Sequence, residues 1–205
     1  LSAHYSELEI FDYLEAKPRA TLDAMMKRGV NAPPASSCGR LFDAFAALLG
    51  LCRDRQEYEG QAGALVEAVV DRDALLGQSG GYPFEISATR SSAPACIDPA
   101  PMWQAALSDL SQGAAPSLMA ARFHLGLAEA VARMAQRLSG EGVVRRFDTV
   151  ALSGGCFQNR ILFEEIARRL RAAGFTVLSH TQVPANDGGL SLGQAAIGAA
   201  RLISA

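Results

Sequence analysis

The chain has 205 residues and a mass of 21.6 kDa, enough for one domain with a hydrophobic core and too little for two large ones. Its formal net charge is −2 and its sequence pI is about 5.9, so it lacks the basic excess that attracts nucleic acids or anionic membranes. With 49% hydrophobic and 20% charged residues, the composition excludes disorder over most of the length. We therefore expect a folded chain that binds neither nucleic acid nor a membrane.

The amino end and the cysteines indicate where the chain works. It begins with Leu1-Ser2-Ala3 and has no initiator Met, so we expect a processed product or a piece of a longer protein. No secretory signal is evident at the start, and the longest apolar run, 41–52, is far shorter than the roughly 20 residues that cross a bilayer. The four cysteines include no C-x-x-C pair, which argues against a thiolate zinc site and favours reduced thiols in the cytoplasm.

Residues 1–140 are dominated by helical periodicity and capping signals. The pattern predicts helices over 6–16, 21–28 with Gly29 as a stop, 40–51, 61–76 and 117–138. Gly, Ser and Pro are frequent in 77–101, where we expect one or two short edge strands around 82–87. The first two thirds of the chain is therefore expected to be rich in helices.

Residues 147–205 follow the order strand, helix, strand, helix. The sequence predicts strands over 148–153 and 175–179, a helix over 159–173 closed by Gly174, and a last helix over 190–203. Two i,i+4 charge pairs are expected on the solvent-facing side of the first of these helices: Glu164 with Arg168, and Glu165 with Arg169. A helix that connects two strands implies parallel neighbours and a right-handed crossover. The fold class is therefore α/β with a helical amino-terminal portion.

Both predicted strands end at the same edge of the sheet, so the loops that follow them should open toward one crevice. The first loop holds Gly154 and Gly155, whose backbone N–H groups at the start of a helix suit a phosphate. The alternative is that the two glycines only make a tight turn. Asn159, one turn further on, could bond a ribose or phosphate, or simply cap the helix.

The second loop places Asp187 at the mouth of the same crevice, beside Asn186 and a Gly-Gly pair. A carboxylate there suits a metal ion that bridges to phosphate, and the alternative is a cap for the last helix. In the amino-terminal part, Asp43 lies near Arg40 on a helix with an otherwise apolar face. On the sequence alone we expect Asp43 to be a solvated charge.

Cys156, His124 and His180 are expected to be structural. Cys156 has no nearby motif that supplies a base, and neither histidine has a second histidine at i+4. No hydrolytic Ser/His/Asp motif and no G-x-x-x-x-G-K-[ST] loop is present in the sequence.

Three segments, in this order and spacing, together resemble one family. They are SSCGRLFDAFAALLG at 36–50 with YEGQA at 58–62, LSGGCFQNR at 152–160, and VPANDGGLSLGQ at 183–194. The combination is similar to the carboxy-terminal part of the HypF carbamoyltransferases of nickel–iron hydrogenase maturation. The resemblance implies that 1–205 forms one lobe of an actin/hexokinase/Hsp70-like ATPase fold.

The resemblance also implies a reaction and a set of site residues. Carbamoyl phosphate and ATP would yield carbamoyl-adenylate, and the carbamoyl group would pass to the carboxy-terminal cysteine of a HypE-like acceptor protein. The residues implied are Asp43, Gly60 and Gln61 at the adenosine end of ATP, Gly154, Gly155 and Asn159 at the phosphate and ribose, and Asp187 on a divalent metal.

The chain departs from the family at the metal. The family completes that site with an H-x-x-x-H pair from the preceding lobe, and this chain has only His4, His124 and His180, none of them so spaced. We therefore expect an inactive lobe whose parent is an enzyme. Two alternatives stay open: a non-catalytic docking lobe for HypE or another subunit, and an ATP-dependent sugar or acid kinase of the same superfamily.

Overall fold

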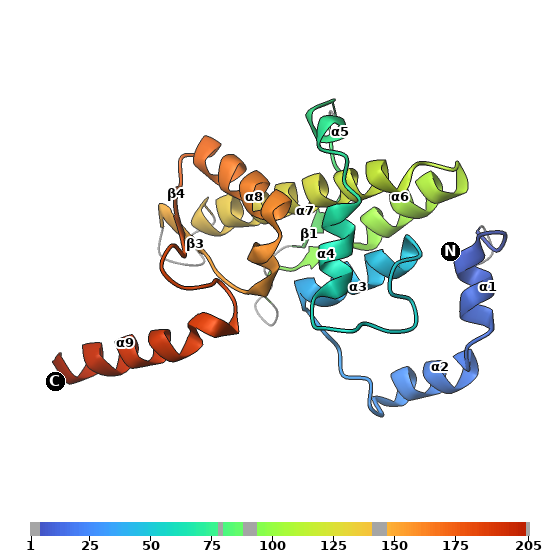
Figure 1. The fold of residues 1–205 in the computed structure, drawn as a ribbon, viewed down its shortest axis with the longest axis horizontal. Coiled ribbons are helices and arrows are strands. Elements are labelled where there is room, and N and C mark those ends of the chain that lie inside the picture. The colour runs from blue at the N-terminus through green and yellow to red at the C-terminus, as the bar shows by residue number, and fades with distance from the viewer. Residues whose placement is uncertain (1–4, 78–79, 88–93, 141–146, 204–205) are drawn as a thin grey trace. The chain divides into compact units, whose positions relative to one another are not determined.

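Two parallel strands, β3 (Thr149–Leu152) and β4 (Thr176–Ser179), are joined by helix α8 (Arg160–Ala172) in the computed structural model (Figure 1). Their register pairs Thr149 with Thr176 and Leu152 with Ser179. The parallel connection predicted from the order of elements is therefore confirmed. The structure describes residues 5–77, 80–87, 94–140 and 147–203.

The chain divides into two compact units. The first comprises Leu1–Pro83 and Pro99–Phe123, and the second comprises Phe84–Asp98 and His124–Ala205. The border between the two units lies within helix α7 (Pro116–Gly140). This helix confirms the long helix predicted over 117–138 and is slightly longer than predicted.

The first unit is helical around an aromatic core. Its helices are α1 (Glu9–Glu15), α2 (Arg19–Arg28), α3 (Cys38–Leu48), α4 (Gln61–Ala68), α5 (Arg72–Gly77), α6 (Ala100–Ser111) and the first turns of α7. Phe45 is fully buried and stacks on Phe123 with ring centroids 4.2 Å apart. Phe42 meets Phe123 edge-on at 5.0 Å. Buried rings of this size dominate the apolar stabilisation of a small core.

Local capping explains where several helices begin and end. Gly29, predicted as a stop, ends α2 with φ +66°. The Ser37 hydroxyl accepts a bond from the backbone N–H of Arg40, so α3 begins at Cys38, two residues earlier than predicted.

The single helix predicted over 61–76 is wrong. The Asp71 carboxylate accepts a 2.9 Å bond from the backbone N–H of Asp73, which caps the start of α5 after α4 has ended at Ala68. Helix α6 was not predicted, because the prolines at its start are typical of loops. Pro is nevertheless favourable in the first turn of a helix.

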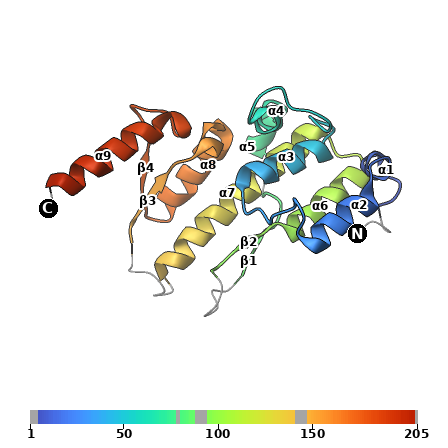
Figure 2. The same ribbon diagram turned by 90° about the horizontal axis from the view of Figure 1, so that it is seen from below.

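The second unit contains two small sheets. Strands β1 (Glu85–Ile86) and β2 (Ile97–Asp98) lie side by side and antiparallel, which confirms short strands in 77–101 (Figure 2). Residues 78–79 and 88–93 of that stretch lie outside the described residues. The remaining elements are the second part of α7, β3, η2 (Gly155–Gln158), α8, β4, η3 (Asp187–Gly189) and α9 (Leu190–Ile203). The chain is therefore α/β with a helical amino-terminal part.

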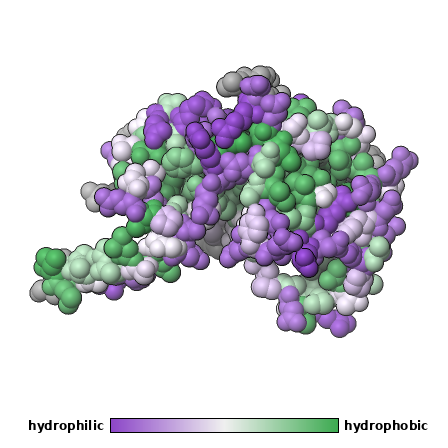
Figure 3. All heavy atoms as spheres, viewed as in Figure 1, coloured by the Kyte–Doolittle hydropathy of each residue, from purple (hydrophilic) through white to green (hydrophobic). Residues whose placement is uncertain are grey.

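Helix α8 buries one face through Ile161, Leu162, Ile166, Ala167 and Leu170. By contrast, every residue of α9 is exposed, although its bounds match the predicted 190–203. Figure 3 shows hydrophobic residues along α9, and the large ones are Leu190, Leu192, Ile197, Leu202 and Ile203. Among the described helices, none combines the length and hydropathy that crossing a bilayer requires.

Candidate functional site

The loops that follow β3 and β4 meet. The backbone N–H of Gly154 donates a 2.7 Å hydrogen bond to the carbonyl of Ala185, which joins the two loops directly. Gly154 has φ +111° and ψ 158°, a conformation that only glycine adopts without strain. This glycine is therefore required by the backbone of the turn, whatever else the loop binds.

An open cavity of about 250 Å³ lies at this edge of the small sheet. Its lining is mixed polar and apolar: Leu152, Phe157, Gln158, Phe163, Ser179, His180, Val183, Pro184 and Ala185. His180 Nε2 lies 2.9 Å from the Ser153 hydroxyl, so it bonds across the two strand ends, consistent with the structural role expected for it. A crevice is present at the predicted edge, but Gly154, Gly155, Asn159 and Asp187 are not among the residues that line it.

Asn159 caps helix α8. Its Oδ1 accepts a 2.9 Å bond from the backbone N–H of Leu162, which confirms the capping role that the sequence left open. Its Nδ2 lies 2.8 Å from Nε2 of His124, a fully buried residue of α7. Contact with a ribose or phosphate remains a prediction, as it does for Gly154 and for the exposed Gly155, which begins η2.

Asp187 is exposed at the start of η3. Its neighbour Asn186, not Asp187, provides the side-chain cap there, because Asn186 Oδ1 accepts a 3.1 Å bond from the backbone N–H of Gly188. Within the described ranges no three His, Cys, Asp or Glu side chains lie close enough to hold a metal ion. Asp187 is a suitable ligand but does not form a complete metal site with these residues.

Asp43 belongs to the first unit, and the expectation that it is a solvated charge is wrong. Its side chain is only 18% exposed, with Oδ2 2.9 Å from the Arg40 guanidinium and Oδ1 accepting a 3.1 Å bond from Gln56. Oδ2 is itself buried and, although ion-paired by distance, receives no hydrogen bond of good geometry. The Arg40 guanidinium reaches the Asp43 carboxylate because Arg40 lies one turn earlier on α3.

Gly60 and Gln61 lie at the start of α4. Gly60 has φ +82° and precedes the first helical residue, and Gln61 Oε1 accepts a 2.6 Å bond from the backbone N–H of Glu57. Since Gln56 bonds to Asp43 and its neighbour Glu57 bonds to Gln61, the loop between α3 and α4 links these residues. The structure therefore assembles the implied site residues as two groups, one in each unit.

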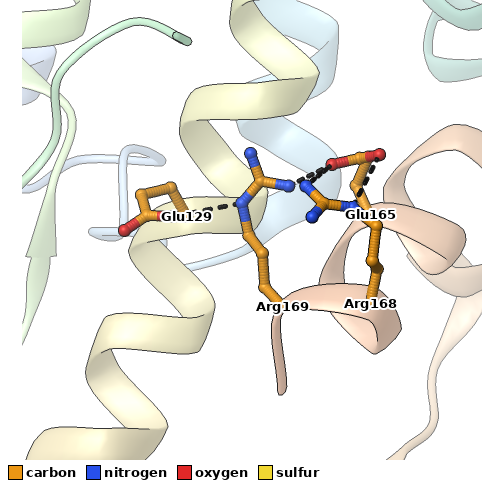
Figure 4. A network of polar contacts seen from close by, with 4 residues as sticks. All are labelled: Glu129, Glu165, Arg168 and Arg169. Carbon is orange, nitrogen blue, oxygen red and sulfur yellow. Dashed lines mark hydrogen bonds and ion pairs between the residues drawn. The ribbon is translucent and has the colours of Figure 1, made fainter. Parts of the chain in front are cut away.

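Helix α8 is held to α7 by the polar network drawn in Figure 4. Arg169 Nε donates a 3.1 Å bond to Glu129 of α7, and Arg168 and Arg169 both donate to Glu165. Burial opposes ionisation of Glu165, but the bonds from the two arginines outweigh it, so the pKa of Glu165 lies below its ordinary value.

The structure confirms one of the two predicted charge pairs on α8. Glu165 pairs with Arg169 and is only partly exposed. Arg168 pairs with Glu165 at 2.9 Å, and Glu164 pairs with Arg160 at 2.6 Å, so the predicted Glu164–Arg168 pair is wrong.

Comparisons with known proteins identify relatives over most of the chain. Residues 2–194 match the family model described as "Carbamoyltransferase, Kae1-like Domain, second subdomain". Carbamoyltransferase HypF of Rhodobacter capsulatus is 41% identical over 189 residues, which are 92% of this chain and 23% of the relative. Carbamoyltransferase HypF2 of Cupriavidus necator is 36% identical over 193 residues, 84% of this chain and 23% of that protein.

Solved structures of HypF proteins are similar to the chain as well. A full-length HypF crystallised in a phosphate- and nucleotide-bound form superposes with a TM-score of 0.78 at 33% identity, covering 92% of this chain and 24% of that one. HypF of T. kodakarensis gives a TM-score of 0.68 at 30% identity, covering 88% and 22%. The chain thus spans about a quarter of the length of these relatives.

Proposed function

Because this chain belongs to the HypF carbamoyltransferase family, as the second subdomain of its Kae1-like domain, we propose that it is the nucleotide-facing lobe of a longer carbamoyltransferase. The observation that carries the proposal is the backbone bond from Gly154 to Ala185, which joins the two loops at the carboxyl ends of parallel strands. Ligands of open α/β sheets bind at such an edge. One solved relative was crystallised in a phosphate- and nucleotide-bound form, which supports a nucleotide site in the proposed lobe.

In this proposal the lobe has an actin/hexokinase/Hsp70-like ATPase fold, and the site residues divide by unit. Asp43, Gly60 and Gln61 hold the adenosine end of ATP, and the second group consists of Gly154, Gly155, Asn159 and Asp187. The backbone N–H groups of the glycine loop and the start of α8 favour phosphate oxygens. A divalent metal on Asp187 requires ligands beyond the described residues, so we derive no step through it.

In the proposed reaction, hydrolysis of carbamoyl phosphate gives carbamate and phosphate. An oxygen of the carbamate then attacks the α-phosphorus of ATP, so that carbamoyl-adenylate forms and pyrophosphate leaves. The acceptor is the carboxy-terminal cysteine of a HypE-like protein, whose thiolate attacks the carbamoyl carbon. A carbon–sulfur bond forms, the bond from carbon to the AMP oxygen breaks, and AMP leaves. We place this chemistry in the cytoplasm, in keeping with four scattered cysteines that include no C-x-x-C pair.

The test is carbamoyl transfer to a HypE-like acceptor by the complete carbamoyltransferase that carries this chain. Asp187→Ala should abolish transfer and leave the circular dichroism spectrum and Tm unchanged. Asp148→Ala, which removes an exposed carboxylate just before β3, is the matched control and should retain transfer. Near-normal transfer by Asp187→Ala would refute its role, and pyrophosphate release by the 205-residue chain alone would refute the idea of a single inactive lobe.

A non-catalytic docking lobe is the second candidate, and the uncovered apolar residues of α9 favour it. In that case the glycine loops are purely structural. Calorimetry with ATP and Mg²⁺ on the complete protein separates the two proposals. An ATP affinity unchanged by Asn159→Ala favours docking, and a weakened affinity favours the nucleotide site.

A further inference from the structure

His124 is a buried polar side chain in direct contact with a residue of the proposed site. It lies on α7 with 0% exposure, and its Nε2 is 2.8 Å from Nδ2 of Asn159. The other end of the Asn159 amide, Oδ1, accepts the backbone N–H of Leu162 at the start of α8. Both ends of this amide are therefore engaged, one by the helix and one by the histidine.

The hydrogen-bonding chemistry assigns the protonation of this pair. Because Oδ1 of Asn159 accepts from a backbone N–H, the nitrogen of the amide is the end that lies toward His124. An amide nitrogen can only donate, so Nε2 of His124 must accept and carries no hydrogen. The ring then holds its hydrogen on Nδ1.

We propose that His124 is a positioning residue, which fixes the amide of Asn159 so that its second N–H and the remaining Oδ1 lone pair are available to the nucleotide. The inference rests on the proposed function, because it assumes that Asn159 contacts ATP. Without the acceptor on His124, the amide of Asn159 keeps its cap bond from the backbone N–H of Leu162 but loses the bond that fixes its Nδ2 end.

A second hydrogen bond joins the same two helices. Arg169, ten residues after Asn159 on α8, bonds to Glu129, five residues after His124 on α7. Two bonds this far apart prevent α8 from turning about its axis without breaking one of them. The cap residue of α8 is therefore held in one place relative to the His124 ring.

The test compares variants of the complete carbamoyltransferase by their KM for ATP. His124→Leu removes the acceptor at similar volume and should raise KM about tenfold, the effect of losing one good hydrogen bond. His124→Gln keeps an acceptor near the Nε2 position and should restore most of the affinity. Leu127→Ala, at a buried position one turn along α7, is the matched control, which should lower Tm and leave KM unchanged.

A double-mutant cycle separates failure of this inference from failure of the proposed function. In the Asn159→Ala background, His124→Leu should add nothing to the KM. If Asn159→Ala alone leaves KM unchanged, the nucleotide contact of the proposed function is refuted. If Asn159→Ala raises KM but His124→Leu does not, only the positioning role is refuted.

The protonation of His124 offers a readout that does not depend on activity. Long-range ¹H–¹⁵N NMR spectra of the 205-residue chain should show hydrogen on Nδ1 and none on Nε2. A ring protonated on Nε2 at neutral pH would overturn the inference, whatever the kinetics.

Discussion

The hydroxyl of Tyr82 donates a 2.7 Å hydrogen bond to Oδ2 of Asp109, and the same oxygen accepts from Arg122 of α7. The backbone of Tyr82 is bound as well, since its N–H donates to the carbonyl of Arg122. Burial of the ring, and then the bond to Asp109, raise the pKa of Tyr82 well above its ordinary value. This side chain therefore connects the chain after α5 to α6 and α7 within the first unit.

Tyr82→Phe should cost about 1 kcal/mol at neutral pH, because Asp109 keeps its partner Arg122. The raised pKa means that the folded state holds the Tyr82 proton more tightly than the unfolded state does. The stabilisation from this group is thus complete below pH 10 and is lost as the pH rises above 10. Urea unfolding between pH 8 and pH 11 should show a steep alkaline loss of stability that Tyr82→Phe flattens.

The control for that series is Tyr58→Phe, since Tyr58 is an exposed ring. It should keep both the neutral stability and the alkaline slope of the original chain. An alkaline slope that survives in Tyr82→Phe would show that other groups cause it.

Glu165→Gln should lower the free energy of unfolding by about 1–2 kcal/mol at pH 7, since it removes a partly buried acceptor of two arginines. The pKa of Glu165 is lower in the folded chain than its ordinary 4.5, so its stabilisation is complete above pH 4.5. It is lost as the pH falls through the folded value. The difference between variant and original chain should therefore shrink in acid, as measured by chemical unfolding from pH 7 to pH 3.

Glu164→Gln is the matched control, because Glu164 is exposed and pairs with Arg160 on the same helix. Its cost should stay below about 0.5 kcal/mol. Equal losses from the two variants would contradict the network of Figure 4.

Gly154→Ala should destabilise the second unit by about 1–3 kcal/mol, because φ +111° is strained for any residue with a Cβ. An added Cβ would meet nothing within 4 Å, so the whole cost is conformational. At Gly155 the added Cβ would touch only Asn186, at 4.0 Å, and φ is not positive. Thermal unfolding should therefore show a marked fall in Tm for Gly154→Ala and little change for Gly155→Ala.

Asp43→Asn should separate a structural role from a role at the nucleotide. Its bond from Gln56 can persist, and the lost pair with the exposed Arg40 is worth less than about 1 kcal/mol. In the complete carbamoyltransferase, however, losing this carboxylate should raise the KM for ATP about tenfold if it holds the adenosine end. Arg40→Gln removes the same ion pair and should leave KM unchanged, so equal effects of the two variants would assign Asp43 a structural role.

The sequence was most informative where local signals agree. Helix α9 and the strands on either side of α8 lie where periodicity places them, and Gly29 and Gly174 end helices with positive φ. The break between α4 and α5 was missed because Asp71 looks like one more solvated residue until its carboxylate caps the next helix. Periodicity alone predicts one continuous helix here, but the bond that Asp71 accepts from the backbone N–H of Asp73 starts a new helix instead.

Part of the candidate site was predictable from the order and direction of the strands. Chain direction alone predicts that the loops after β3 and β4 meet, and the bond from Gly154 to Ala185 agrees. The contact between His124 and Asn159 depends on packing between distant segments, and the bond from Gln56 to Asp43 comes from the loop after α3. Residues 124 and 159 are 35 positions apart, and no periodic pattern relates them.

The exposed apolar residues of helix α9 affect the apparent free energy of unfolding of this chain. The large apolar residues are exposed along the whole helix, so two copies in solution can bury this surface against each other. Association that favours the folded chain adds a mass-action contribution to its apparent stability. Unfolding curves of the 205-residue chain should therefore be recorded at several protein concentrations, and the dilute limit gives the stability of the single copy.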